Sequence, residues 1–285
     1  MQQKGHNMNS QTKLIANFHT HTTRCRHADG EDREYVEAAI KAGYKVLGFS
    51  DHCPWAFPEG YDSTIRMKLN EIDGYFSSLE SLKKEYASDV KIYIGYETEY
   101  YPELIPAQDE FLKDYPVDYM IQGQHNIQPE YRDQYYTGAE TFDEKRLEDY
   151  VELCIAGMKT GRYLYLAHPD LINYAGDKTV FNKHMTKLFT YLKEENIPLE
   201  FNILGFFQER NYPSRKFLEL AKEVGNNIII GVDAHSPSLL ADTKTIERAV
   251  SMISEYDIPL YNGDFLEERI NAGKYVRYCE QIMNK

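Results

Sequence analysis

Short apolar runs rich in β-branched and aromatic residues alternate along the chain with longer segments whose apolar residues recur at helical spacing. The short runs predict strands at residues 14–18, 46–50, 91–97, 119–124, 163–167, 198–203 and 227–232. The longer segments predict helices at residues 31–42, 67–86, 105–112, 142–158, 178–195, 214–224, 243–254 and 264–283. Strands that alternate with helices in this way indicate a parallel sheet.

Seven such strand-to-helix units follow one another without a low-complexity linker. They predict an α/β fold, a closed or nearly closed barrel, with a long open doubly wound sheet as the alternative. No GxGxxG follows the first strand and no GxxxxGK[ST] occurs, so a nucleotide-binding loop is not supported. We predict one domain over residues 13–285, preceded by a flexible polar tail at residues 1–12.

The chain carries 45 acidic and 32 basic residues, a formal net charge of -13. Since no basic stripe is visible, this charge argues against nucleic acid and anionic membranes as partners. No apolar run reaches the roughly 18 residues of a membrane span, and no signal peptide opens the chain. Four cysteines without CxxC or framework spacing favour a reducing compartment and predict a cytoplasmic location: Cys25, Cys53, Cys154 and Cys279.

Histidines and carboxylates gather at the C-terminal ends of the predicted strands. His19 and His21 end the first strand two residues apart, so both imidazoles, the commonest metal ligands, point to one side. Further candidates follow this strand and the others: His27, His52, Glu97, His125, His168, Asp233 and His235. In an α/β barrel these ends meet at the rim where active sites lie, which predicts a metal centre. The two remaining histidines, His6 and His184, are interpreted as surface residues.

Nine candidate ligands are enough for two or three metal ions that share a bridging carboxylate. Nitrogen and oxygen ligands suit zinc, manganese or iron, and the sequence does not choose among these metals. Cys25 and Cys53 flank candidate ligands and are interpreted as packing residues. Asp51 and Asp170 are interpreted as groups that orient a ligand or cap a helix. No feature of the sequence indicates an oligomeric state.

These motifs, in this order, resemble those of the polymerase and histidinol phosphatase (PHP) family. They are His19-x-His21 with His27, Ser50-Asp51-His52, Gly95-x-Glu97, His125, Ala167-His168-Pro169-Asp170 and Asp233-Ala234-His235. The resemblance runs from Phe18 to about Ser238, and the length and single-domain layout are similar to the stand-alone histidinol-phosphatase branch. It implies a distorted TIM-like (β/α)7 barrel with a trinuclear metal centre at the C-terminal strand ends.

The resemblance also implies how the ligands divide among three ions. One ion would be held by His19, His21, Glu97 and Asp233, a second by Glu97, His125 and His168, and the third by His27, His52 and His235. Val232 and the Gly123-Gln124-His125 motif depart from the family's usual serines, but no ligand is lost. Asn173 stands where histidinol phosphatases tend to carry a basic residue, which bears on the substrate.

The expected activity is metal-dependent hydrolysis of a phosphomonoester, with L-histidinol phosphate, of histidine biosynthesis, as the first candidate substrate. Clustered ions bind phosphate oxygens and lower the pKa of a bound water, so the expected nucleophile is a metal-held hydroxide, with no separate protein nucleophile. Arg210 and, second, Arg66 are the candidates to bind the phosphate. The alternatives are a related phosphoesterase for another small phosphate or a short oligonucleotide, and a non-catalytic metal-binding regulatory module.

Overall fold

Parallel strands form the centre of the fold, in a computed structural model that describes residues 14–58 and 60–271. One sheet has the order β1-β2-β3-β4, and a second sheet pairs β5 with β6. The strands are β1 (Ala16–Asn17), β2 (Val46–His52), β3 (Lys91–Thr98), β4 (Tyr119–Gln122), β5 (Leu199–Asn202) and β6 (Ile228–Gly231). Every residue of β2 is buried, as expected for a parallel strand that is covered on both faces.

Single bridged residues join the two sheets into a ring. Leu166 pairs in parallel with Gln122 at the end of β4 and with Leu199 at the start of β5. On the opposite side, Thr20 pairs with Ala234, just beyond β1 and β6. The predicted (β/α)7 barrel is therefore confirmed in a distorted form, and the open doubly wound alternative is not needed.

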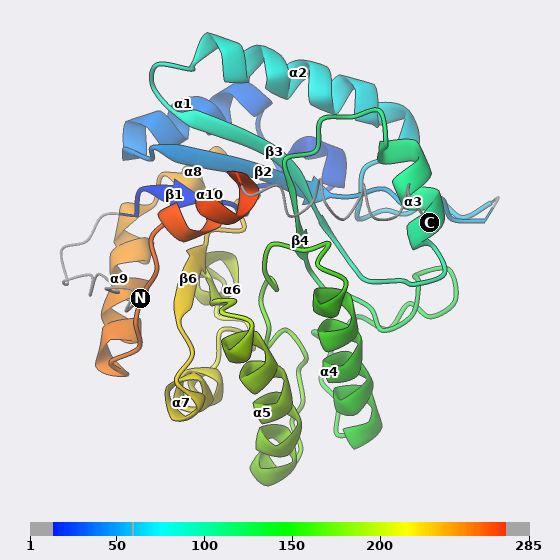
Figure 1. The fold of residues 1–285 in the computed structure, drawn as a ribbon, viewed down its shortest axis with the longest axis vertical. Coiled ribbons are helices and arrows are strands. Elements are labelled where there is room, and N and C mark those ends of the chain that lie inside the picture. The colour runs from blue at the N-terminus through cyan, green and yellow to red at the C-terminus, as the bar shows by residue number, and fades with distance from the viewer. Residues whose placement is uncertain (1–13, 59, 272–285) are drawn as a thin grey trace.

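Helices cover the outside of this ring (Figure 1). They are α1 (Asp32–Ala42), α2 (Ile72–Glu85), α3 (Ile105–Leu112), α4 (Glu144–Lys159), α5 (Lys178–Glu194), α6 (Ile203–Phe207), α7 (Arg215–Val224), α8 (Pro237–Leu240), α9 (Thr243–Glu255) and α10 (Asp264–Asn271). In Figure 1, α1 and α2 lie over β2 and β3, whereas α4, α5, α7 and α9 occupy the other half. None of the helices within residues 14–58 and 60–271 is long and apolar enough to cross a membrane.

Most predicted elements are found within a few residues of their expected bounds, with three exceptions. The strand predicted at residues 163–167 is reduced to one bridged residue, Leu166, because His168 turns the backbone into the left-handed region (φ 32°) directly after it. The helix predicted from residue 67 begins at Ile72, after a 3₁₀ turn at Leu69–Glu71. The short helices α6 and α8 were not predicted. The tail at residues 1–12, His6, Cys279 and residues 272–283 lie outside the described residues.

Candidate metal centre

The C-terminal ends of the strands surround a cavity of about 480 Å³, with Glu97 of β3 on its wall. Five imidazoles lie around this one buried carboxylate. The Glu97 Oε1 atom is 2.8 Å from His168 Nε2 and 3.4 Å from His125 Nε2. Its Oε2 atom is 3.2 Å from His52 Nδ1, 3.4 Å from His21 Nε2 and 3.5 Å from His19 Nε2. Burial opposes ionisation, but the charges of His125, His19 and His52 hold the pKa of Glu97 well below its usual value.

Asp233 forms the second carboxylate of the cluster, two residues beyond β6. Its Oδ1 atom lies 3.0 Å from His21 Nε2 and 3.4 Å from His19 Nε2. Burial raises the pKa of Asp233, yet His19, His21 and His235 lower it to well below the ordinary range. Asp233 adopts a left-handed backbone (φ 53°), as His168 does. Non-glycine residues rarely adopt this conformation, and it is concentrated at functional sites.

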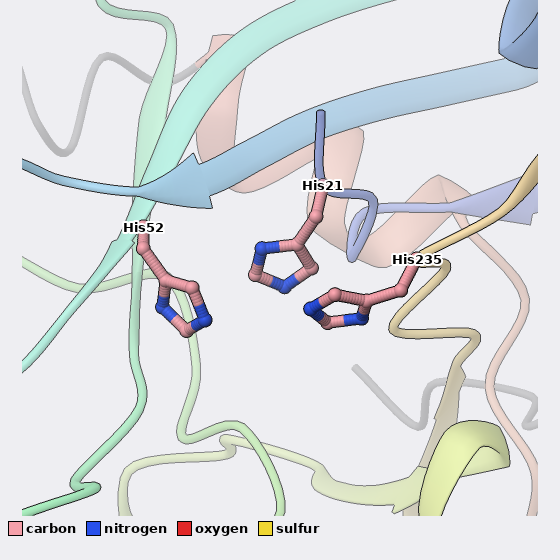
Figure 2. Close-up of side chains that lie close together, drawn as sticks. All are labelled: His21, His52 and His235. Carbon is pink, nitrogen blue, oxygen red and sulfur yellow. The ribbon is translucent and has the colours of Figure 1, made fainter. Parts of the chain in front are cut away.

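A third corner of the cluster is formed by His21, His52 and His235, which come from three separate segments and point toward a common space (Figure 2). One ring nitrogen from each of them lies within 4.8 Å of the others. The His21 ring centroid is 4.1 Å from that of His235 and 4.4 Å from that of His52. His27 stacks on the outer side of His235, at 4.6 Å. All nine predicted ligands are thus brought to one rim.

Several polar atoms in this cluster are buried without a hydrogen-bond partner. They are His19 Nε2, both ring nitrogens of His21, Glu97 Oε2, His168 Nδ1, Asp233 Oδ1 and His235 Nε2. Leaving one such atom unsatisfied costs about 1–3 kcal/mol, so a concentration of them at one point requires a ligand. Imidazole nitrogens and carboxylate oxygens are the donor set of zinc, manganese and iron sites. The residues therefore fit bound metal ions.

Buried carboxylates stand behind three of the histidines. Glu200 Oε1 accepts from His19 Nδ1 at 2.8 Å, and Glu99 Oε1 accepts from His125 Nδ1 at 3.0 Å. Asp51 Oδ1 lies 3.5 Å from His21 Nδ1, as its interpretation as an orienting group requires. Such carboxylates fix the ring and leave the opposite nitrogen for a metal. Glu200 and Glu99 were not predicted as site residues, although each is a carboxylate within or directly beyond a buried apolar strand.

The two candidate phosphate-binding arginines are placed differently. Arg66 is 2% exposed and does not line the cavity. Its guanidinium donates from Nη2 to Glu99 Oε1 at 3.0 Å and from Nε to Glu130 Oε1 at 2.6 Å. Arg210 does line the cavity, where its Nη1 donates to the Tyr212 hydroxyl at 2.8 Å. Arg210 thus lies at the cavity, whereas Arg66 is paired with two buried carboxylates.

Other sequence interpretations have mixed outcomes. His184 was predicted at the surface, which is wrong: it is 7% exposed on the inward side of α5, with Nε2 2.9 Å from Glu144 Oε1. Asp170 accepts from the backbone N–H of Ser214, the residue that caps α7, at 2.8 Å. Cys53 is a packing residue, as interpreted. Cys25 is more than a packing residue, because its thiol lies beside ring nitrogens of the histidine cluster.

A sequence model of the PHP domain matches residues 17–203. The chain belongs to the PHP domain family. A probable histidinol-phosphatase of Deinococcus radiodurans is 27% identical over 78% of this chain and 87% of that protein. A histidinol-phosphatase of Lactococcus lactis is 25% identical over 88% of this chain and 95% of that protein.

Solved structures of PHP proteins share the fold. The crystal structure of histidinol phosphate phosphatase from Lactococcus lactis, complexed with zinc, L-histidinol and phosphate, aligns with a TM-score of 0.66 at 19% identity. The match covers 87% of this chain and 95% of that one. A putative histidinol phosphatase from Listeria monocytogenes aligns with a TM-score of 0.60 at 22% identity, over 81% of this chain and 99% of that one. These alignments support the distorted barrel.

Proposed function

We propose that this protein is a metal-dependent phosphomonoesterase that hydrolyses L-histidinol phosphate to L-histidinol and phosphate. The observation that carries the proposal is the cluster of seven histidines, Glu97 and Asp233, most of them buried, which opens to a cavity of about 480 Å³. The relatives from Deinococcus radiodurans and Lactococcus lactis are named probable histidinol-phosphatase and histidinol-phosphatase, respectively. Zinc is the first metal to test, since the Lactococcus lactis structure contains it.

We further propose that the nine residues hold two or three ions in the groups that the PHP resemblance implies. Glu97 would be shared between two ions, because its two oxygens face different histidines: His168 and His125 on one side, His52 and His21 on the other. When bound, the ions supply positive charge to phosphate oxygens and lower the pKa of a water molecule. Glu200 and Glu99 keep His19 and His125 in the orientation that binding needs.

Arg210 is proposed to bind the phosphate group. It lines the same cavity as His168 and Asp233, and its contact with Tyr212 holds the guanidinium at the rim. Guanidinium groups bind phosphate oxygens in a planar, bidentate manner. Asn173, which replaces an expected basic residue, instead donates to the Gly138 carbonyl at 3.3 Å and does not line the cavity.

The wall of the cavity formed by Tyr61, Glu130 and Gln134 is proposed to face the organic part of the substrate. Arg66 lies between two buried carboxylates, Glu99 and Glu130, so this group of three carries one surplus negative charge. L-Histidinol phosphate carries an ammonium group, and a negative wall opposite a phosphate-binding rim complements that charge distribution. Glu130 would contribute no electrostatic attraction to the binding of a phosphate ester without a cationic group.

A phosphate-release screen with zinc-loaded protein over small phosphomonoesters tests the proposal. L-Histidinol phosphate is expected to give the highest kcat/KM, and a Glu130→Gln variant is expected to lose most of its preference for that cationic ester. Hydrolysis of other monoesters but not of this one would refute the substrate. If metal-loaded protein releases phosphate from none of them, the chain is a metal-binding module and the catalytic proposal fails.

A cytoplasmic location is also proposed. Three cysteines within the described residues, Cys25, Cys53 and Cys154, are free thiols, which is typical of proteins from reducing compartments.

A further inference from the structure

The thiol of Cys25 lies where imidazoles of the candidate metal centre meet. Cys25 is fully buried at the end of a 3₁₀ turn, η1 (Thr23–Cys25), that follows His21 closely in the chain. Its sulfur and one ring nitrogen from each of His27 and His235 lie within 4.8 Å of one another. The same limit holds for the sulfur with His21 and Asp51. These spacings are those of ligands around an ion rather than of a thiol in an apolar core.

Backbone hydrogen bonds determine which nitrogens face this sulfur. His27 Nδ1 donates to the Cys25 carbonyl at 2.7 Å, and His235 Nδ1 donates to the Asp233 carbonyl at 3.0 Å. A carbonyl only accepts, so both rings carry their proton on Nδ1 and present a bare Nε2, the form that binds metal. His235 Nε2 is buried and has no hydrogen-bond partner, so a bound metal ion would satisfy this atom.

The adjacent histidine gives an independent sign that a ligand belongs here. His21 is fully buried, and neither of its ring nitrogens has a hydrogen-bond partner. The turn that carries Cys25 is held in place by Thr22, which caps it and donates its hydroxyl proton to Asp51. The sulfur is therefore placed by the local chain and not by the collapse of side chains around it.

Cys53 provides the contrast within the same protein. It directly follows the candidate ligand His52, yet its sulfur accepts from Gln108 Nε2 at 3.2 Å and it belongs to the apolar core. Sequence proximity to a ligand does not explain the position of Cys25.

We propose that Cys25 is a thiolate ligand of the ion held by His27 and His235. Its thiol proton is released to solvent when the metal binds. A sulfur ligand makes this site softer than a site of nitrogen and oxygen ligands alone, and so favours zinc over manganese there. The inference rests on the proposed metal centre but not on the identity of the substrate.

Cobalt(II) replacing the native metal tests the proposal, because a thiolate on cobalt gives a charge-transfer band in the near ultraviolet that nitrogen and oxygen ligands do not. Wild type and Cys53→Ser are expected to show this band. Cys25→Ser is expected to lose it while it retains the visible bands of bound cobalt. A band that survives in Cys25→Ser, or is absent from cobalt-loaded wild type, overturns the role of Cys25 and leaves the metal centre standing.

Two further outcomes are informative. Wild-type protein that binds no cobalt and no zinc overturns the metal centre and this inference together. If Cys25→Ser does not fold, as judged by circular dichroism, X-ray absorption at the zinc edge of the wild-type protein shows whether sulfur is a ligand. A sulfur neighbour at about 2.3 Å supports the ligand, whereas a shell of nitrogen and oxygen alone refutes it.

Discussion

At the scale of single residues, Glu200 shows how one buried carboxylate organises several parts of the site. It accepts from His19 Nδ1 at 2.8 Å and from the His168 backbone N–H at 2.7 Å. It also accepts from Asn202 Nδ2 at 3.0 Å. Glu200 therefore fixes both the ring of one candidate ligand and the backbone of another, although its own carboxylate does not face the cavity.

Replacing Glu200 with Gln is expected to lower zinc affinity and kcat by about 10- to 100-fold, the usual cost of losing such a carboxylate. The amide is a weaker acceptor for His19 and carries a donor that opposes the His168 N–H. Competition with a chromophoric chelator measures the affinity. Glu247→Gln, at an exposed position of α9, is the matched control and should behave as wild type. Equal affinities in both variants would contradict the role of Glu200.

Arg210→Ala is expected to reduce kcat/KM for L-histidinol phosphate by about 10- to 100-fold, because a hydrogen bond to a charged group contributes about 1.5–3 kcal/mol. Arg210→Lys should recover only part of the loss, since an ammonium cannot make the bidentate contact. Arg215→Ala, at the exposed start of α7, controls for the loss of a nearby positive charge. Steady-state kinetics in which Arg210→Ala matches this control would exclude Arg210 from the phosphate site.

The gathering of the nine candidate ligands at one rim could be predicted from the sequence because the signal is local. Each one lies near or beyond the C-terminal end of an apolar strand, and the C-terminal ends of parallel strands meet at one rim. The sequence does not show which carboxylate orients which histidine. His19 and Glu200, for example, are 181 positions apart, and only the closed ring brings them together. Arg66 is a similar case: it was predicted as the second candidate to bind the phosphate, and its pairing with two buried carboxylates was not predicted.

At the scale of elements, glycines at strand ends make room for the carboxylates. A Cβ atom at Gly123, directly after β4, would overlap the carboxylate of Glu97. A Cβ atom at Gly231, the last residue of β6, would overlap that of Glu200. Neither glycine has a positive φ, so close approach, not backbone conformation, excludes a side chain at these two positions.

Gly123→Ala is therefore expected to displace Glu97 and to lower the number of metal ions bound per chain, with little change in helix content. Elemental analysis and circular dichroism measure the two quantities. The control is Gly74→Ala in α2, where a Cβ atom meets nothing within 4 Å. That variant should bind metal normally and gain about 0.5–1 kcal/mol in stability. Normal metal content in Gly123→Ala would show that Glu97 is not a ligand.

The elements that were not predicted from the sequence are those that depend on tertiary contacts. The helices α6 and α8 have five and four residues, too short to be stable alone or to show a period. Each is fixed instead by a cap at the rim: Asn202 accepts from the Gly205 N–H, and Ser236 from the Leu239 N–H. Likewise, the segment around Leu166 pairs with both neighbouring strands over too few residues to form a strand.

At the scale of the whole molecule, the candidate ligands come from both sheets and from the segment that joins them. His19 and His21 follow β1, Glu97 belongs to β3, His168 follows the Leu166 bridge, and Asp233 follows β6. Ions bound to them would connect parts of the ring that otherwise meet through single bridged residues. Metal binding and the stability of the barrel should therefore be coupled.

Removal of metal by a chelator is expected to lower Tm, and a return of zinc is expected to restore it. Ligand binding to the folded state at 100 to 1,000 times Kd adds about 2.7–4.1 kcal/mol. Scanning calorimetry on apoprotein and reconstituted protein, with metal content verified by elemental analysis, measures the shift. An unchanged Tm after complete removal of the metal would show that the ions do not connect the ring.

The most direct test of the central claim is a metal titration of apoprotein with phosphate release from L-histidinol phosphate as the readout. Turnover should be absent without metal and rise with added zinc to a plateau at two or three ions per chain. His52→Ala, if folded, should bind fewer ions and lose turnover. Full turnover by the metal-free wild-type protein, or by a His52→Ala variant that has lost bound metal, would contradict a catalytic metal centre on this rim.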